Sequence, residues 1–349
     1  MSDETAEWLN TQTLIGFTDK RGNAWHYRAE YQGDESNHYP GEIPAADVHR
    51  RLFNWEAVEL PLYAQVTDTD GSTRYIPIED RKAIARPDTW DVFGVPKQGY
   101  SPHQFSEWLV ESVESLVGDG LGIASAGLLK KGAVAWVQVE VPDTVDTPAG
   151  FSFRPFLTAA TSLDLSLATV YKRGSQATVC DNTLALALAE QTEQVRIKHS
   201  SNSQLRLADA REALLLVEKQ ADEFTDAVAA LVDWRVTTRE WLSFLDATVP
   251  VDESKPGRSL TLATNRRQAL TELYTHDDRC APWNGTALGV LQATNTYQHH
   301  VQRVKGDTPR AQRNALNALT GVTAKADART LAVLASITPA PASLHLAGV

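Results

Sequence analysis

The sequence is poor in sulfur and has no long apolar run. Its 349 residues include two cysteines and one methionine. Cys180 and Cys280 lie far apart, which argues against a disulfide framework and indicates a reducing compartment. No stretch of about 18 apolar residues occurs, so we expect no membrane span. The opening stretch MSDETAEWLN lacks the apolar centre of a signal peptide, and we therefore expect a cytoplasmic protein.

The sequence also lacks the common signatures of catalysis and of metal binding. The Gly-rich stretch 118–127 fits neither the dinucleotide fingerprint nor a phosphate-binding loop. The turn 68–71 is no calcium loop, because the first and twelfth positions of such a loop would be Val and Pro. His299 and His300 are adjacent, so on a helix they diverge by about 100° and cannot hold one ion together. We expect no metal and no cofactor, and an enzyme is the least favoured of three possible functions.

Charge is spread unevenly along a chain whose formal net charge is −11. Residues 1–150 hold 12 Lys and Arg against 24 Asp and Glu, whereas residues 151–211 hold 7 against 5. The second stretch is the only one with a positive balance. Because a polyanion responds to the local field, nucleic-acid binding there is compatible with an acidic chain.

The hydrophobic pattern divides the chain into three parts. Residues 1–54 are broken by Gly and Pro and predict an irregular segment with one short helix, 45–53. Residues 55–202 predict an antiparallel sheet domain with a crossing helix, and residues 203–349 predict an all-helical domain. The predicted fold class is therefore α+β. The expected strands are 57–66, 74–78, 91–95, 122–128, 133–141, 151–159, 165–171, 176–180 and 194–198.

Local signals predict where several helices begin. Ser101 and Gln104, with Pro102 between them, form a capping box at a helix start. A helix from Asn182 to Glu190 should be capped by Asp181 or Asn182. We expect the apolar residues of that stretch to be buried: Val179, Cys180, Leu184, Leu186 and Leu188. A further capping box, Thr237 with Glu240, begins a helix in the last part.

Apolar residues after position 203 follow an alternating spacing of three and four, which predicts a coiled-coil seam. The seam residues are Leu207, Leu214, Val217, Phe224 and Val228. Such a seam favours self-association, so we expect a homo-oligomer. It also supports an alternative function, an assembly or interaction protein that acts through its helical half without binding nucleic acid.

Cations and aromatic residues gather on the predicted strands between residues 150 and 200. The candidate contacts are Arg154, Tyr171, Lys172, Arg173, Arg196, Lys198 and His199. Basic side chains on a sheet, with aromatic rings on which bases stack, are typical of single-stranded nucleic-acid binding. The alternative is a solvated sheet face whose cations pair with nearby carboxylates (Asp164, Asp181, Glu190 and Glu193). Arg196 and Lys198 are two residues apart on a strand, so we expect both outward and Ile197 in the core.

Four stretches resemble the phage/plasmid-like protein family, the domain of unknown function numbered 932. They are 92-VFGVPKQGYSPHQFSEWL-109, 161-TSLDLSLATVYKRGSQATVCDNTL-184, 196-RIKHSSNSQLRLADARE-212 and 284-NGTALGVLQATNTYQHH-300. The family occurs in phages, plasmids and their bacterial hosts. Its element order is similar to that of single-strand annealing proteins of the RecT/Redβ kind, by analogy of fold. The resemblance implies a non-enzymatic protein of a mobile element that binds and anneals single-stranded DNA during recombination.

Overall fold

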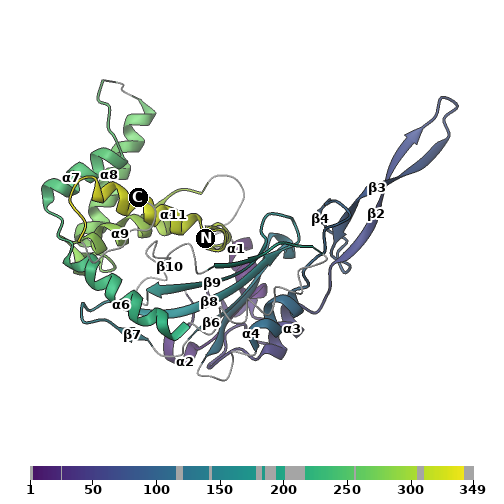
Figure 1. Ribbon diagram of the computed structural model, residues 1–349, viewed down its shortest axis with the longest axis horizontal. Coiled ribbons are helices and arrows are strands. Elements are labelled where there is room, and N and C mark those ends of the chain that lie inside the picture. Colours follow the sequence, from purple (N-terminus) through teal and green to yellow (C-terminus); the bar gives the residue numbers. More distant parts are fainter. Residues whose placement is uncertain are drawn as a thin grey trace. The chain divides into compact units, whose positions relative to one another are not determined.

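The structure is a computed structural model of the chain (Figure 1). It describes residues 3–24, 26–114, 121–140, 144–177, 183–184, 194–200, 217–254, 257–304 and 310–341. The chain forms two compact units. Unit 1 comprises Met1–Pro142, Leu157–Arg173 and Gln194–Leu215, and unit 2 comprises Asp143–Phe156, Gly174–Glu193 and Leu216–Val349. The fold class is α+β, as predicted, with antiparallel sheets followed by a helical C-terminal region. None of the described helices is long and apolar enough to cross a membrane.

An antiparallel sheet forms the centre of unit 1, and two of its strands run on into residues of unit 2, 152–156 and 174–177. Its strands are β1 (Thr13–Ile15), β5 (Gly122–Leu129), β6 (Val134–Glu140), β8 (Ser152–Ser162), β9 (Thr169–Ala177) and β11 (Gln194–Ile197). They are ordered β1-β5-β6-β8-β9, with β11 also paired to β9. Gly127 lies opposite Trp136, and a Cβ at position 127 would stand 2.2 Å from the indole ring. Only glycine leaves room for this ring on the sheet.

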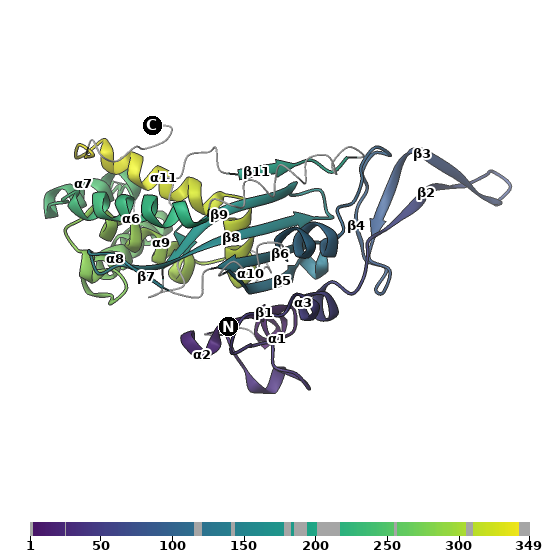
Figure 2. The same cartoon turned by 60° about the horizontal axis from the view of Figure 1, so that its bottom comes forward.

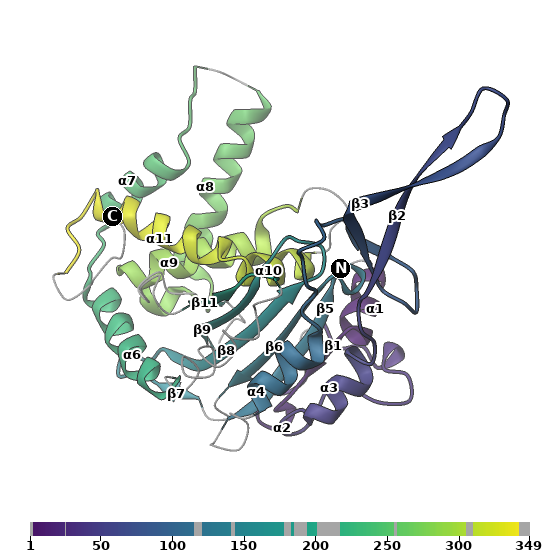
Figure 3. The same ribbon diagram turned by 45° about the vertical axis from the view of Figure 1, so that its right-hand side comes forward.

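Helices cover the β5 and β6 strands (Figures 2 and 3). They are α3 (Ala45–Leu52), the π-helix η2 (Ser106–Glu111) and the short α4 (Ser112–Glu114). The predicted capping box at Ser101 is wrong, because the helix begins only after residue 104. The Gln104 side chain instead donates to the carbonyl oxygen of Ala57 (3.1 Å) and accepts from its amide (2.9 Å). This side chain therefore joins two distant parts of the chain instead of capping a helix.

The first 54 residues are more regular than their Gly and Pro content predicts. They form α1 (Asp3–Thr11), β1, α2 (Thr18–Arg21), the 3-10 helix η1 (Ala29–Tyr31) and α3. Strand β1 pairs with β5 and so belongs to the main sheet. The prediction of an irregular segment is wrong, since three-residue strands and single helical turns are too short to give a periodic pattern.

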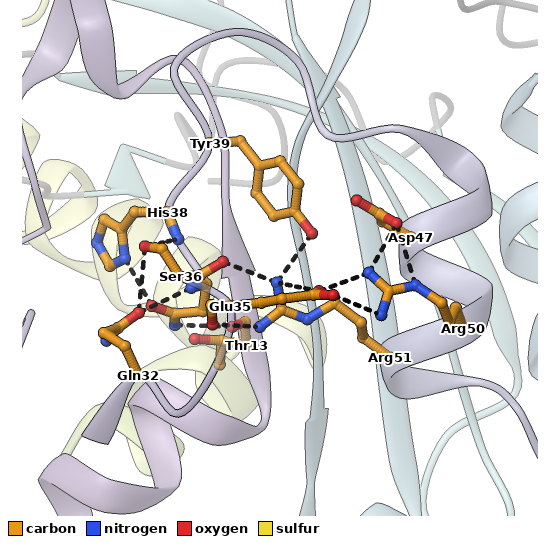
Figure 4. A network of polar contacts seen from close by, with 10 residues as sticks. Thr13, Gln32, Glu35, Ser36, His38, Tyr39, Asp47, Arg50 and Arg51 are labelled. Carbon is orange, nitrogen blue, oxygen red and sulfur yellow. Dashed lines mark hydrogen bonds and ion pairs between the residues drawn. The ribbon is translucent and has the colours of Figure 1, made fainter. Parts of the chain in front are cut away.

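Side-chain hydrogen bonds hold this N-terminal segment together (Figure 4). The buried Asn37 amide donates to the carbonyl oxygens of Leu9 (3.2 Å) and Thr13 (2.8 Å). The oxygen of the same amide lies 2.7 Å from Nδ1 of His38. Farther out, Arg50 makes two hydrogen bonds with the Glu35 carboxylate, at 2.6 and 3.1 Å. These contacts add to backbone hydrogen bonds of the same segment, such as those that join Ile15 to Asn37 (2.9 Å) and Tyr39 to Ile15 (2.8 Å).

A second sheet has three strands, two of which form a long ribbon that is visible in Figure 1. Its strands are β2 (Val58–Thr67), β3 (Thr73–Ala85) and the short β4 (Val92–Gly94). The predicted strands 57–66, 74–78 and 91–95 are confirmed. At its outer end both faces meet solvent, since the successive residues Tyr75 and Ile76, which point to opposite faces, are exposed by 65% and 44%. Alternation predicted a half-buried strand, but the outer half of the ribbon has no layer packed on it within unit 1.

Two predictions around residue 180 are wrong. The strands 165–171 and 176–180 were expected to be separated by a turn, but residues 172–175 lie inside β9, which is one continuous strand. Where a helix was expected from Asn182, Thr183 and Leu184 form the short strand β10, paired with residues 175 and 176 of β9. The remainder of that predicted helix, and Val179, Cys180, Leu186 and Leu188, lie outside the described residues.

Unit 2 is mainly helical. Its helices are α6 (Val217–Asp233), α7 (Thr238–Thr248), α8 (Arg258–His276), η6 (Ala281–Trp283), α9 (Ala287–Thr296), η7 (Tyr297–Val301), α10 (Arg310–Leu319) and α11 (Val322–Ala335). Strand β7 (Val145–Asp146) pairs with the start of β8. Every residue of α9 is buried, against α6, α8 and α11. The predicted capping box is confirmed, since Thr237 and Glu240 cap each other reciprocally at the start of α7.

Candidate nucleic-acid interface

The candidate cations lie on the edge of the unit 1 sheet where β11 pairs with β9. Arg196 is the partner of Val170, and Gln194 that of Lys172. Paired residues of an antiparallel ladder share a face, and so do residues two apart on one strand. Lys172, Arg196 and Lys198 therefore share one face, which we name the outer face. Arg196 and Lys198 are exposed and Lys172 is half-buried.

The outward position of Arg196 and Lys198 and the burial of Ile197 are confirmed. Val170, the partner of Arg196, is buried, so the exposed part of the outer face follows β11. The alternation of charged and aliphatic residues along β11 therefore predicted correctly which side chains lie on each face of the strand. This edge exposes one guanidinium group and one ammonium group, with the half-buried Lys172 beside them.

Three other predicted contacts do not lie on this surface. Arg154 is only 7% exposed, so its prediction as a surface cation is wrong. Tyr171 is 2% exposed, and its hydroxyl donates to the carbonyl oxygen of Trp108 (2.6 Å). His199 follows Ile197 in pointing to the opposite, inner face, where its Nε2 lies 3.1 Å from the Thr161 hydroxyl. The side chain of Arg173 lies outside the described residues.

The inner face carries a column of four stacked rings. His103 lies 3.7 Å from Trp108 and 4.0 Å from His199, measured between ring centroids, and Tyr100 stacks on His199 at 5.0 Å. The planes of successive rings differ by 4°, 13° and 15°. We name these four residues the ring column. It connects the segment before η2 with the end of β11.

Two threonine hydroxyls join the histidines of the ring column from the side. His103 Nδ1 lies 2.6 Å from the Thr169 hydroxyl, which lies 2.7 Å from the Thr161 hydroxyl. Thr161 in turn contacts Nε2 of His199. In either direction of donation each hydroxyl donates once and accepts once, and both imidazoles stay neutral. The relay therefore satisfies one nitrogen of each imidazole and joins two strands, β8 and β9, to the two loops that carry His103 and His199.

Burial makes both imidazoles poor bases. It lowers the pKa of His103 to about 3, with a further lowering from His199. It lowers the pKa of His199 to about 4, against a smaller opposing effect of the Ser101 backbone. Neutral rings enclosed by a tryptophan and two threonines suit the joining of strands better than proton transfer with a substrate. No three His, Cys, Asp or Glu side chains meet as metal ligands would within the ranges that the structure describes.

The predicted oligomerisation seam is partly used inside unit 2. The Phe224 ring lies 4.2 Å from that of Phe153, and Val228 is fully buried in the core of the unit. These two side chains are thus occupied within the chain. Leu207, Leu214 and the side chain of Val217 lie outside the described residues, so self-association through the seam stays a prediction for them.

The ring column was missed in the sequence, although a signal for it was present. Tyr100, His103 and Trp108 belong to the stretch 92–109, and His199 to the stretch 196–212, both noted for their resemblance to a family. Spacing along the chain could not bring these segments together, because β5, β6, β8 and β9 intervene between them. The pairing of β11 with β9 brings the two segments together.

Comparison of the chain with curated proteins gave no match, and comparison with solved structures gave none. The family model described as "Domain of unknown function (DUF932)" matches residues 92–320. This range contains both the outer face and the ring column. Because the match covers more than half of the chain, the protein belongs to the DUF932 family.

Proposed function

We propose that this protein binds single-stranded nucleic acid through the outer face of β9 and β11. On this proposal it acts without catalysis, as an annealing protein of a phage or plasmid type element, in the cytoplasm. The observation that carries it is the exposure of Arg196 and Lys198 on one face, with Lys172 beside them. The resemblance in element order to single-strand annealing proteins supports the annealing step.

The geometry of the outer face suits a phosphate backbone. Two residues apart on a strand, the Cα atoms of Arg196 and Lys198 are separated by roughly 6.6 Å. Arg offers a planar fork of donors to a phosphate, and Lys offers a compact charge, so both types bind phosphate oxygens well. The stretch 151–211 that contains them holds 7 Lys and Arg against 5 Asp and Glu, whereas the first 150 residues are strongly acidic.

Charge reversal tests the proposal. The double variant Arg196→Glu with Lys198→Glu should lose affinity for an oligo(dT) strand, measured by fluorescence anisotropy at several salt concentrations. Two lost phosphate contacts should lower the slope of log K against log salt by about 1.4. A matched control, Arg258→Glu with Lys325→Glu, makes the same change of charge at exposed positions of unit 2.

Annealing is tested with the same variants. The wild-type protein should accelerate the pairing of two complementary strands, and the outer-face variant should not. If the wild-type protein fails to bind oligo(dT) at low salt, or if both double variants behave alike, the outer face is not a nucleic-acid interface.

A further inference from the structure

Left-handed backbone gathers at one end of the unit 1 sheet. Among the residues that the structure describes, five other than glycine have a positive φ. Four of them lie in three neighbouring turns: Trp90 (58°), Lys130 (49°), Lys131 (59°) and Leu165 (67°). This conformation is unfavourable for any residue with a Cβ and rare for bulky ones. Strain of this kind concentrates at functional sites, where surrounding contacts maintain it.

Contacts between the turns fix them to one another. Lys130 forms an ion pair with Asp164 (2.7 Å), and the Leu163 amide donates to the carbonyl oxygen of Ala133 (2.7 Å). A Cβ on Gly94 would lie 3.4 Å from the Leu165 side chain, so the third turn touches β4. The three turns, 86–91, 130–133 and 163–167, therefore form one surface of unit 1.

Large apolar side chains on this surface meet solvent. Trp90 is 63% exposed, Val92 57% and Leu165 47%. Phe93 points the other way, toward Trp55, with 6.1 Å between the ring centroids. Alternation along β4 therefore turns Val92 outward, together with Gly94 and the Leu165 beside it. An exposed tryptophan on a fixed turn is a rigid platform for a flat partner.

The same end of the sheet carries Lys198. Ile197, the last residue of β11, is paired with Thr169, which follows directly on the turn 163–167. The Tyr100 hydroxyl donates to the carbonyl oxygen of Ser162 (3.4 Å), just before that turn, and the Tyr100 ring stacks on His199. The cations of the outer face thus lead to the surface that exposes Trp90.

Charge on this surface does not oppose a polyanion. Asp88 is paired with Arg86 (2.6 Å) and Asp164 with Lys130. Lys131 is exposed next to them. The third carboxylate of these turns, Asp91, accepts a hydrogen bond from the Thr89 hydroxyl (2.9 Å). Three cations and three carboxylates make the turns neutral overall, which is compatible with a nucleic-acid strand that continues from Lys198.

We infer that Trp90 stacks on an unpaired base of the single strand whose phosphates Arg196 and Lys198 hold. The inference rests on the proposed function and adds to it the residue that recognises the base. Tyr171, the aromatic residue expected to stack from the sequence, is buried. A tryptophan ring on an exposed turn accepts any base by stacking, which suits a protein that must hold strands of any sequence.

Substitution of Trp90 tests this inference against two ligands. One is oligo(dT), and the other is a strand of equal length in which most nucleotides are abasic. Trp90→Ala should weaken oligo(dT) binding about 5- to 150-fold, the range for the loss of one stacked base. It should leave binding of the abasic strand unchanged, since that strand keeps its phosphates. Trp90→Phe should retain most of the affinity, because phenylalanine also stacks.

A matched control is Tyr75→Ala, which removes an equally exposed aromatic residue (65%) from the β2–β3 ribbon. It should change neither affinity. If the wild-type protein binds neither ligand, both the proposed function and the stacking role are wrong. If charge reversal at Arg196 and Lys198 abolishes binding but Trp90→Ala does not affect it, the outer face stands and the stacking role is refuted. Equal losses on both ligands would also refute stacking, and would favour a role of Trp90 in the fold or in a protein contact.

Discussion

The two faces of the β9–β11 pair have opposite character, although they alternate residue by residue. Arg196 and Lys198 on the outer face reach solvent, whereas Ile197 and Tyr171 on the inner face are almost completely buried. The inner face is joined to η2 by the ring column and the threonine relay. A substitution on the inner face should therefore change stability, and one on the outer face should change binding.

The difference shows how a strand can serve stability and function at once. Each added pair of residues extends both faces, so the run Arg196–His199 combines side chains that lie on opposite faces. Arg196 and Lys198 reach solvent, whereas Ile197 and His199 attach the strand to the inner face. If stability and binding are separated in this way, the effects of substitutions on stability should decrease from the inner face to the outer face.

Among the substitutions, removal of Trp108 should produce the largest loss of stability. This side chain is 2% exposed and stacks on His103, so Trp108→Ala leaves a large cavity on the inner face. We expect a decrease of about 3–5 kcal/mol in the free energy of unfolding, measured by urea denaturation with circular dichroism. Trp90→Ala, at an exposed tryptophan, should cost less than about 0.5 kcal/mol. Equal losses for the two variants would contradict the separation of roles.

Acid should destabilise the inner face next. The pKa of His103 is lowered to about 3 and that of His199 to about 4 in the folded protein, whereas an unfolded histidine has a pKa near 6.5. As the pH falls below 6.5, the unfolded chain therefore binds protons that the folded chain does not. The free energy of unfolding should decrease from pH 6.5 to about 4, by roughly 1.4 kcal/mol per pH unit for each histidine. Above pH 6.5 both histidines are neutral in the folded and in the unfolded chain, so their titration no longer lowers the free energy of unfolding.

Asparagine at position 103 supplies the comparison for this pH dependence. The amide nitrogen of Asn occupies about the place of Nδ1, so His103→Asn can keep the hydrogen bond to Thr169 but does not titrate. The slope of unfolding free energy against pH between 6 and 4 should then be lower by roughly one proton. An unchanged slope would show that His103 is not a buried neutral ring. His26, His38 and His299 also have lowered pKa values, so some slope should persist.

Loss of the hydrogen bonds between Thr161, Thr169 and the two histidines should lower the free energy of unfolding by a smaller amount. Thr169→Val keeps the volume of a fully buried side chain but leaves His103 Nδ1 without its partner. We expect a loss of about 1–3 kcal/mol, the range for an unsatisfied buried polar group. Thr161→Val should behave similarly, and the double variant should lose less than the sum, because the two hydroxyls bond each other. Strict additivity of the two losses would show that the relay is not one unit.

Much of the fold follows from local patterns. The strands 57–66 and 133–141 alternate between two kinds of residue, and the capping box at Thr237 is specified by four residues. These features depend on neighbours in the chain, so the sequence displays them directly. The face assignment of Arg196, Ile197 and Lys198 was predictable for the same reason.

The predictions that are wrong concern residues whose conformation depends on contacts with distant parts of the chain. In the sequence Gln104 has the spacing of a capping residue, but in the structure its side chain bonds to the distant Ala57. Tyr171 was expected at the surface, but η2 covers it. Thr183 and Leu184 pair with β9 although their sequence is compatible with a helix. The ring column likewise exists only once β11 has paired with β9. No periodicity within any one of these segments could have indicated such contacts.

The smallest effect on stability belongs to the outer face itself. Arg196→Ala removes an exposed side chain, so the free energy of unfolding should change by less than about 0.5 kcal/mol. The next residue provides the control, since Ile197→Val removes one methylene group from the inner face and should cost about 0.5–1.5 kcal/mol. The order should reverse for oligo(dT), where Arg196→Ala weakens binding and lowers the salt slope by about 0.7 while Ile197→Val leaves both unchanged. If Arg196→Ala destabilised the fold more than Ile197→Val, the arginine would be part of the structural framework, and the division of labour between the two faces would be wrong.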